Sequence, residues 1–308
     1  MMKIFVEKMM APHDSAVYAS EGVAGGVSGW DAVDEAAVER YEEDGFLLVR
    51  DAIPREVVEA AVAELQGMRE ADDPDCQGVY FEGLIRGWLG LSSFDPDLPD
   101  TPQLTQLAMS EAVDSLAELP REARIDLVRK FMGFVVTHPP LAAVAHYGPL
   151  LRTIERMAGT PLRLFQDMAM IKPPEGREKP WHQDHAYFNL PLDTPVVAAW
   201  VALSDATIEN GCMHVMPGGH RTGPRIHFMR RDWQICDTDV VRERRLAVPM
   251  AVGDVLLFDG KLPHGTPTNR TEQQRWALQL HYIPRDAREV DEGLRLETFG
   301  SEGKDVSC

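Results

Sequence analysis

Two histidines and a carboxylate lie within four residues of one another in the segment KPWHQDHAYFN, residues 179–189. Alternate side chains of a β-strand point to the same face, so His182 and Asp184 can direct an imidazole and a carboxylate at one point while Gln183 faces away. Both groups are common ligands of transition metals. The segment therefore predicts part of a metal site. The alternative is a polar strand end beside a turn.

A third ligand must come from elsewhere, and His264 in the segment FDGKLPHGTPTN is the best candidate. It follows an apolar stretch and lies in a turn rich in Pro and Gly. Two histidines and one carboxylate form the facial triad of non-haem Fe(II) oxygenases, which leaves positions on the iron open for a 2-oxo acid and O₂. The spacing therefore predicts an oxygenase site.

The distal carboxylate of such an acid requires a fixed planar cation, and Arg275 meets this requirement. It opens the segment RWALQLHY, in which Arg275, Ala277 and Gln279 would share one strand face while the residues between them are apolar. This alternation predicts a polar barrel interior and an apolar exterior that packs on helices.

Sequence patterns place helices mainly in the first half of the chain and strands in the second. Helical periodicity and capping signals predict helices over residues 31–45, 53–68, 101–119, 120–134 and 148–159. Segments bounded by Gly and Pro turns predict strands over 46–51, 161–172, 195–206, 212–219, 254–260 and 275–284. A long ordered loop over 71–100 is expected to contribute Tyr80, Phe81 and Trp88, either to substrate contacts or to core packing. The predicted fold is mainly β with flanking α, a sandwich or closed barrel covered on one face by N-terminal helices.

The chain of 308 residues is expected to divide into three parts. Residues 1–30, rich in Gly, Ala and Ser without periodicity, are expected to form a loosely ordered arm. Residues 31–284 are expected to form a single oxygenase domain, with a helical part over 31–159 and a β core over 160–284. Residues 285–308 are expected to form a charged tail.

Composition argues against two classes of partner. Phosphate backbones are bound by surplus Lys and Arg, so a formal net charge of −18 disfavours nucleic acid. No apolar run approaches the roughly 20 residues that a membrane-spanning helix requires, and Lys3, Glu7 and Lys8 interrupt any secretory signal. We therefore predict a cytoplasmic protein that binds neither nucleic acid nor membranes. Nothing in the sequence indicates its oligomeric state.

Four segments resemble the phytanoyl-CoA dioxygenase family of Fe(II)/2-oxoglutarate oxygenases. They are YEEDGFLLVRDAI, IKPPEGREKPWHQDHAYF, WVALSDATIENGCMHVMPGGHR and GDVLLFDGKLPHGTPTNRTEQQR. The resemblance runs from about residue 31 to 284 and departs from the family only locally, in the PGGH turn that ends at His220. It implies a double-stranded β-helix (jelly-roll, cupin-like) core. It also implies a reaction that decarboxylates 2-oxoglutarate to succinate and CO₂ while a substrate C–H bond is hydroxylated or otherwise oxidised.

The resemblance also implies cofactors and roles for individual residues. The expected cofactors are Fe(II), O₂ and 2-oxoglutarate as co-substrate. The expected iron ligands, which are also the expected catalytic residues together with Arg275, are His182, Asp184 and His264. The residues expected at the 2-oxoglutarate site are Arg275, which would pair with the C5 carboxylate, and Thr266, Gln166 and Met168. Related halogenases carry a small residue in place of the carboxylate, so Asp184 indicates oxidation without halide.

Three aromatic residues are candidates for a substrate wall. Tyr187 and Phe188 follow the strand of His182, and Trp200 lies on another predicted strand. Such a wall would orient an apolar substrate, although ordinary core packing explains these aromatic residues equally well.

The insert over residues 224–245 is rich in arginine within an acidic chain. If it covers the mouth of the barrel, Arg230 and Arg231 could bind the carboxylate or phosphate of an anionic substrate. The alternative is that these arginines pair with acidic residues of the insert. The expected partner is a small molecule, with an anionic compound and a natural-product intermediate as two options.

Two other functions could use the same residues. A barrel without catalytic activity could bind a ligand, and a metal-dependent isomerase or hydrolase could use the same three ligands. Arg275 has no obvious role in either case, so the dioxygenase is the preferred hypothesis. The other histidines expected to be structural, or to form hydrogen bonds around the metal ligands, are His185, His214, His220 and His281.

Overall fold

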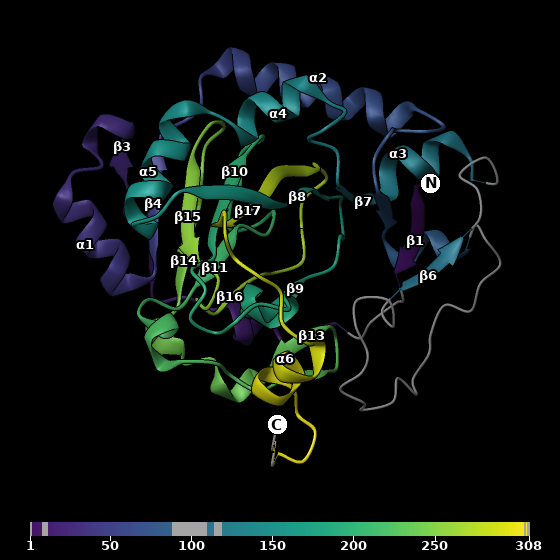
Figure 1. The fold of residues 1–308 in the computed structure, drawn as a ribbon. Coiled ribbons are helices and arrows are strands. Elements are labelled where there is room, and N and C mark those ends of the chain that lie inside the picture. Colours follow the sequence, from purple (N-terminus) through teal and green to yellow (C-terminus); the bar gives the residue numbers. More distant parts are fainter. Residues whose placement is uncertain (1, 8–11, 88–109, 114–118, 305, 307–308) are drawn as a thin grey trace.

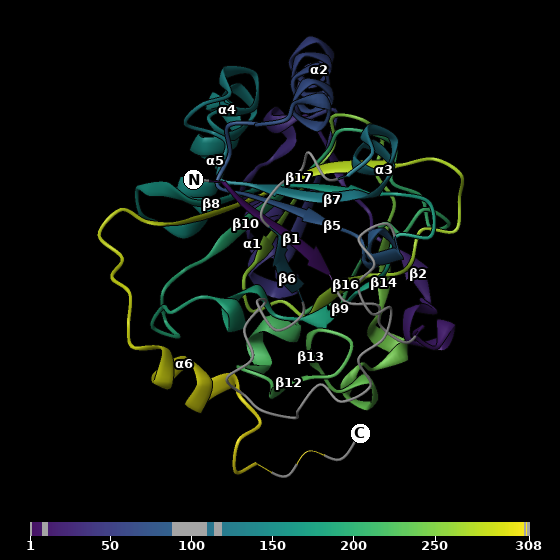
Figure 2. The same cartoon turned by 90° about the vertical axis from the view of Figure 1, so that its right-hand side faces the viewer.

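Two β-sheets packed face to face form the body of the protein. The computed structural model describes residues 2–7, 12–87, 110–113, 119–304 and 306 (Figure 1). One sheet has ten strands and the other five. Helices cover the outer face of the larger sheet, and the smaller sheet lies on its opposite side (Figure 2). This arrangement confirms the expected jelly-roll core, mainly β with N-terminal helices on one face.

The larger sheet combines strands from both halves of the chain. In spatial order its strands are β3 (Val27–Ser28), β4 (Phe46–Arg50), β15 (Val255–Asp259), β10 (Val197–Ala202), β17 (Arg275–Pro284), β8 (Leu162–Lys172), β7 (Val128–Met132), β5 (Gly78–Phe81), β1 (Lys3–Glu7) and β6 (Ser110–Val113). The antiparallel pair of β8 and β17 places Lys172 opposite Arg275. Four of the strands predicted from residue 161 onward, β8, β10, β15 and β17, therefore form the centre of this sheet.

The smaller sheet carries two of the three candidate metal ligands, His182 and His264. In spatial order its strands are β2 (Gly22–Val23), β14 (Leu246–Val248), β11 (Met213–Val215), β16 (His264–Thr266) and β9 (Lys179–His182). A separate antiparallel hairpin pairs β12 (His227–Met229) with β13 (Trp233–Ile235). The register of β9 and β16 sets His182 opposite His264, although these residues are far apart in the sequence.

Local sequence signals determine where the first helix begins and ends. The described residues form α1 (Glu35–Asp44), α2 (Arg55–Glu70), α3 (Arg121–Leu127), α4 (Pro139–Ala145), α5 (Gly148–Ala158) and α6 (Glu292–Phe299). At the start of α1 the Asp34 carboxylate accepts the backbone N–H of Ala37, and at its end Gly45 adopts a left-handed φ of 80°. None of the helices in the described part of the chain has the length and hydropathy needed to cross a membrane.

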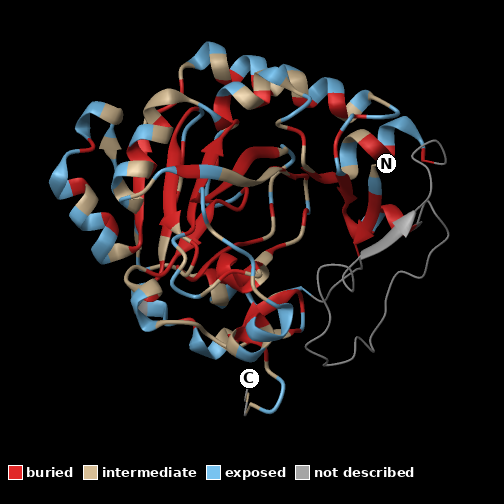
Figure 3. Ribbon diagram, viewed as in Figure 1, coloured by how far each residue is buried: buried red, intermediate tan, exposed pale blue. Residues whose placement is uncertain are grey.

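Side chains of the central strands point alternately to the two faces of the larger sheet, and this divides the core into two layers. On β17, Trp276, Leu278 and Leu280 pack in the layer beneath the helices. Arg275 and Gln279 point the opposite way and line a cavity between the sheets. β10 alternates in the same manner between the two layers. The polar interior predicted from this alternation is confirmed, and Figure 3 shows the buried central strands beneath helices with exposed outer surfaces.

Two of the expected helices differ from the structure. Over residues 120–134, α3 stops at Leu127 and Val128–Met132 forms β7 between β5 and β8. Strand pairing on both sides supplies backbone hydrogen bonds that outweigh the local helical pattern. Of the helix expected over 101–119, residues 110–113 are the part described as regular structure, and they form β6.

Segments expected to lack regular structure also contribute strands and a helix. The expected loop over 71–100 contains β5 with Tyr80 and Phe81, whereas Trp88 lies outside the described residues. Within residues 1–30, β1, β2 and β3 each join a sheet. Within residues 285–308, α6 packs on the 3₁₀ turn η6 (Asp184–Tyr187). These contacts depend on tertiary pairing, which composition does not reveal. The division into arm, oxygenase domain and tail stays a prediction.

Candidate metal centre and co-substrate cavity

The three predicted metal ligands come together at the edge of the smaller sheet. β9 ends at His182, and Gln183 keeps an extended backbone, so Asp184 at the start of η6 turns to the same side as His182. The Nε2 atoms of His182 and His264 lie 3.3 and 3.5 Å from Oδ1 of Asp184. The potential ligand atoms of the three residues all lie within 4.8 Å of one another, a spacing that suits a single metal ion.

Hydrogen bonds select the imidazole tautomer that can bind a metal. Nδ1 of His182 lies 2.7 Å from the carbonyl oxygen of Pro180, and Nδ1 of His264 lies 2.9 Å from that of Leu262. A carbonyl oxygen only accepts, so Nδ1 carries the proton and Nε2 presents its lone pair to the space beside Asp184. This donor set fits iron and other divalent transition metals.

Two residues of β17 hold the Asp184 carboxylate from behind. Nε2 of His281 lies 2.8 Å from Oδ2 of Asp184, and the Gln279 amide donates to the same oxygen at 3.3 Å. Oδ1 is thereby left facing the two candidate histidine ligands. His281, expected to be structural, therefore contacts a candidate ligand directly.

The charge states of these residues also suit a metal. Burial opposes ionisation of Asp184, but the nearby His264 and His281 hold the pKa of its carboxyl well below the usual range. Burial and the neighbouring His182 lower the pKa of His264 to about 3. At neutral pH the site therefore presents an anionic carboxylate and a neutral His264 imidazole.

Arg275 is a buried cation without an acidic partner. Its side chain opens β17 and is 2% exposed, with Nη1 donating to the carbonyl oxygen of Gly211 at 3.1 Å and the guanidinium lying 5.0 Å from the Trp200 ring centroid. Nε makes no hydrogen bond, and no carboxylate of the described residues pairs with the guanidinium. Burial lowers the pKa of Arg275 to about 10, so the group stays charged at neutral pH. Burying a charge is costly unless an opposite charge lies near it, so this part of the cavity is suited to bind an anion.

The remaining predicted co-substrate residues line the same cavity. Its volume is about 240 Å³, and the three candidate metal ligands and Arg275 form part of its wall. Thr266 lies two residues beyond His264 on β16. Gln166 and Met168 lie on β8, opposite His281 and Gln279 of β17. The structure therefore brings Arg275, Thr266, Gln166 and Met168 into one cavity with the triad.

The three predicted aromatic residues also line the cavity. Tyr187 presents its ring edge-on to His182 at 5.6 Å and donates its hydroxyl to the carbonyl oxygen of Trp233 at 2.7 Å. Phe188 packs edge-on against His281 at 4.9 Å. Trp200 lies beneath Arg275. Each ring therefore contacts a residue of the site as well as the core.

The two arginines suggested as anion ligands lie elsewhere. Arg231 is buried, with Nε on Glu178 and with Nη1 and Nη2 bonded to the Asp237 carboxylate at 2.7 and 2.8 Å. Arg230 is exposed. Neither side chain lines the cavity. For Arg231, the structure matches the alternative of pairing with acidic residues.

Sequence reasoning missed an ionic wall of the cavity. Glu7 of β1 pairs with Arg129 of β7 at 3.3 Å and with Arg177 at 2.7 Å. Asp232 pairs with Arg177 at 3.2 Å and with Lys179 at 2.9 Å. The wall joins the N-terminal strand to the segment before His182. No local sequence pattern predicts this ionic wall, because its residues come from four separate parts of the chain.

Lys130 is a second missed residue of the cavity wall. It lies on β7, and its Nζ is 3.9 Å from the centroid of the Tyr80 ring. Burial lowers its pKa to about 7. Treating the segment VRKFM as a strand between its neighbours, instead of a helix end, would have drawn attention to it.

The chain is similar in sequence to a known protein family. A family model described as Phytanoyl-CoA dioxygenase (PhyH) matches residues 41–277. The human protein named phytanoyl-CoA dioxygenase, peroxisomal, is 25% identical over 265 residues, which cover 82% of this chain and 68% of the human one.

Solved structures share the fold at low sequence identity. The alpha-ketoglutarate-dependent carbocyclase SnoK from nogalamycin biosynthesis superposes with a TM-score of 0.59 at 20% identity, covering 92% of this chain and 97% of its own. The epimerase SnoN, solved in complex with Fe³⁺, alpha-ketoglutarate (2-oxoglutarate) and nogalamycin RO, gives a TM-score of 0.55 at 20% identity, covering 84% of this chain and 86% of its own. SnoN thus binds iron and 2-oxoglutarate on a fold similar to this one, and the triad of this chain fits an iron ion.

Proposed function

The chain belongs to the phytanoyl-CoA dioxygenase family, and from this premise we propose that it is an Fe(II)- and 2-oxoglutarate-dependent dioxygenase that hydroxylates a C–H bond of a small molecule. The bound iron and co-substrate would supply the activation of O₂, with 2-oxoglutarate converted to succinate and CO₂. The proposal is carried by one observation: three converging metal-ligand side chains share a cavity with the buried Arg275, which forms no ion pair in the described part of the chain.

The residues of the cavity have distinct tasks in this proposal. His182, Asp184 and His264 would hold the metal, and because they supply only three ligands, positions on the metal stay open for the 2-oxo acid. Arg275 and Thr266 bind the distal carboxylate of 2-oxoglutarate. Gln166 and Met168 form the wall of the co-substrate site, because they project from β8 beside β17.

The substrate would lie against the aromatic side of the cavity. Tyr187 and Phe188 follow the metal-ligand segment, and Trp200 closes the wall beneath Arg275. We propose a small molecule of natural-product type, in keeping with SnoK and SnoN. An anion contact from Arg230 or Arg231 has no support in the arrangement of the cavity wall. A cytoplasmic location stays a prediction from sequence, since the human relative is named peroxisomal.

Halogenation is disfavoured because Asp184 occupies the position that a halide would need, and we propose hydroxylation or another oxidation of a C–H bond instead. SnoK and SnoN are named a carbocyclase and an epimerase, so product analysis must distinguish hydroxylation from ring formation and inversion. A metal-dependent hydrolase or isomerase would bind the metal but leave Arg275 without a function. A non-catalytic barrel would release no succinate.

Binding of the co-substrate tests the proposal without knowledge of the substrate. Addition of 2-oxoglutarate to the Fe(II) protein under anaerobic conditions should produce a weak visible charge-transfer band, and His182→Ala should abolish it. Absence of the band in folded wild-type protein would contradict the proposed function. A hydrolase or isomerase would show metal binding but no response to 2-oxoglutarate.

Arg275→Met should weaken 2-oxoglutarate binding about 100-fold or more, because it removes the charged partner of a buried carboxylate. Iron affinity should change little, since Arg275 is not a candidate metal ligand. The measurement is anaerobic titration calorimetry. Arg288→Met, which removes an exposed arginine, is the matched control. Equal 2-oxoglutarate affinities of the two variants would exclude Arg275 from the site.

A further inference from the structure

Lys172 is a buried lysine to which the proposed reaction assigns no task. It ends β8 directly opposite Arg275 and is 5% exposed. Its Nζ donates to Oγ1 of Thr266 at 2.9 Å, to the carbonyl oxygen of Thr266 at 3.3 Å, and to that of Pro267. Across the described ranges, no carboxylate forms an ion pair with it.

Gly211 allows both cations to approach the same place. Nη1 of Arg275 donates to the carbonyl oxygen of Gly211, and a Cβ added to Gly211 would lie 3.4 Å from Nζ of Lys172. The same Cβ would also collide with the carbonyl oxygen of Pro267, and the φ of 81° at Gly211 disfavours any other residue. The side chains of Lys172 and Arg275 therefore both lie next to Gly211.

Charging both Lys172 and Arg275, which are buried and form no ion pair with the described residues, is costly in the absence of an anion. Burial and the neighbouring charge of Arg275 lower the pKa of Lys172 well below its usual range. A carboxylate bound at Arg275 and Thr266 would offset both charges. The pair therefore suits the distal carboxylate of a dicarboxylic acid.

Contacts of Thr266 show how Lys172 can act on a ligand that it does not touch. Thr266 lines the cavity, whereas Lys172 lies behind it and is not part of the cavity wall. Because the ammonium donates to Oγ1, the hydroxyl hydrogen of Thr266 must point to another acceptor. The cavity is where a bound carboxylate would supply that acceptor.

We propose that Lys172 is a positioning residue, which orients the Thr266 hydroxyl toward the distal carboxylate of the 2-oxo acid and supports it with a second positive charge. The site then selects a dicarboxylic 2-oxo acid over a monocarboxylic one. This inference rests on the proposed function, since it names a determinant of co-substrate choice in the same cavity.

Two 2-oxo acids of equal length test the inference. 2-Oxoglutarate and 2-oxopentanoate differ only in a carboxylate or a methyl group at the far end. Anaerobic calorimetry with the Fe(II) protein gives both dissociation constants for wild type, Lys172→Met, Lys172→Gln, Lys172→Arg and Thr266→Val. Lys3→Met, which removes an exposed lysine of β1, is the matched control.

Loss of a hydrogen bond to a charged group predicts that Lys172→Met weakens 2-oxoglutarate binding about 10- to 100-fold. Binding of 2-oxopentanoate and of Fe(II) should stay within about twofold of wild type, and Lys172→Arg should restore most of the selectivity. Thr266→Val should cause a similar loss, and the double variant Lys172→Met/Thr266→Val should lose little more, because both changes remove one linked interaction.

Equal weakening of both acids would overturn the inference, because it would indicate a purely structural role. Unchanged binding of 2-oxoglutarate would overturn it as well. If Lys172→Met does not fold, Lys172→Gln and Thr266→Val decide by the same comparison. Failure of the proposed function can be distinguished from failure of this inference, because the wild-type protein would then bind neither 2-oxo acid at the metal.

Discussion

Each carboxylate oxygen of Asp184 has a separate task. Oδ1 faces Nε2 of His182 and His264, while Oδ2 accepts hydrogen bonds from the side of β17. A ligand held in this way does not need to reorient when the metal binds. Partners behind metal ligands typically contribute 10- to 100-fold to affinity.

His281→Phe should therefore lower Fe(II) affinity about 10- to 100-fold, because Oδ2 of Asp184 loses its 2.8 Å partner. Anaerobic metal titration measures the change. His220→Gln, on a ring that contacts the carbonyl oxygen of Glu42, is the control. Unaltered affinity in His281→Phe would show that Gln279 alone holds the carboxylate.

At the scale of elements, Gln183 fastens the metal-ligand segment to two other parts of the chain. Its side-chain amide donates to the carbonyl oxygens of Gly223 at 3.0 Å and Lys261 at 2.6 Å, and accepts the backbone N–H of Arg225 at 2.8 Å. Its own backbone N–H donates to Nε2 of His227 at 3.0 Å. The start of the arginine-rich insert thus braces the metal site.

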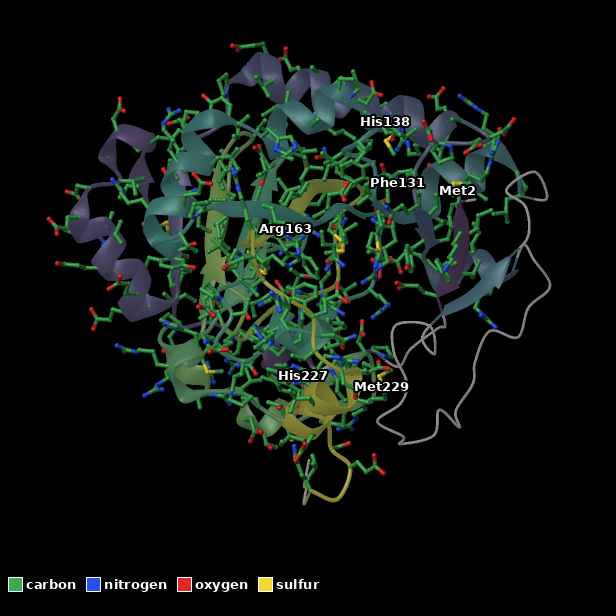
Figure 4. The ribbon with its side chains drawn as sticks, in the orientation of Figure 1. Met2, Phe131, His138, Arg163, His227 and Met229 are labelled. Carbon is green, nitrogen blue, oxygen red and sulfur yellow. The ribbon has the colours of Figure 1, made fainter. Side chains whose placement is uncertain are left out.

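The C-terminal helix supports the same segment. Arg295 of α6 donates to the carbonyl oxygen of Ala186 at 2.9 Å, and Phe299 packs with Met229 and Trp233. Figure 4 shows His227 and Met229 beside this C-terminal segment, drawn in yellow. The residues after β17 therefore hold η6, which carries Asp184, in place.

Gln183→Leu should lower the free energy of unfolding by about 2–4 kcal/mol, because three part-buried backbone groups, of Gly223, Arg225 and Lys261, lose their side-chain partner. It should also weaken iron binding, since the side-chain link from the metal-ligand segment to Lys261, in the loop before His264, is lost. Urea unfolding measures the first effect and metal titration the second. Gln273→Leu, on an exposed turn residue, is the control. A loss below about 0.5 kcal/mol would contradict the bracing role.

At the scale of the whole molecule, a bound metal would link β9 and η6 to β16. A ligand that binds only the folded state at 100 times its dissociation constant adds about 2.7 kcal/mol of stability. For a domain of about 150–250 residues, each kcal/mol changes the melting temperature by about 2–4 °C. The metal would therefore be a measurable part of the stability of the protein.

Chelation of the metal should lower the melting temperature by about 5–10 °C. Asp184→Ala, which lacks one ligand, should show little response to the chelator and is the control. Differential scanning calorimetry measures both. Equal responses of wild type and Asp184→Ala would place the stabilising metal at another site.

The candidate ligands and the central strands could be derived from sequence because both depend on local patterns. The residue spacing of His182 and Asp184 and the alternation of β17 follow from the two-residue period of a strand. Capping residues around α1 act over a few positions. His264 and Arg275 were predicted from their positions after an apolar stretch and at the start of a strand, and the family resemblance agreed with both, although no local rule connects either residue to His182.

The register and packing of the strands determined the remaining contacts of the site. Lys172 faces Arg275, and His281 reaches Asp184, only because β8, β9 and β17 pair and pack in this arrangement. β7 became a strand for the same reason, since it gained neighbours on both sides. Such contacts join residues that are far apart in the chain, so residue types and periodicity identify the metal ligands but not the groups that hold them in place.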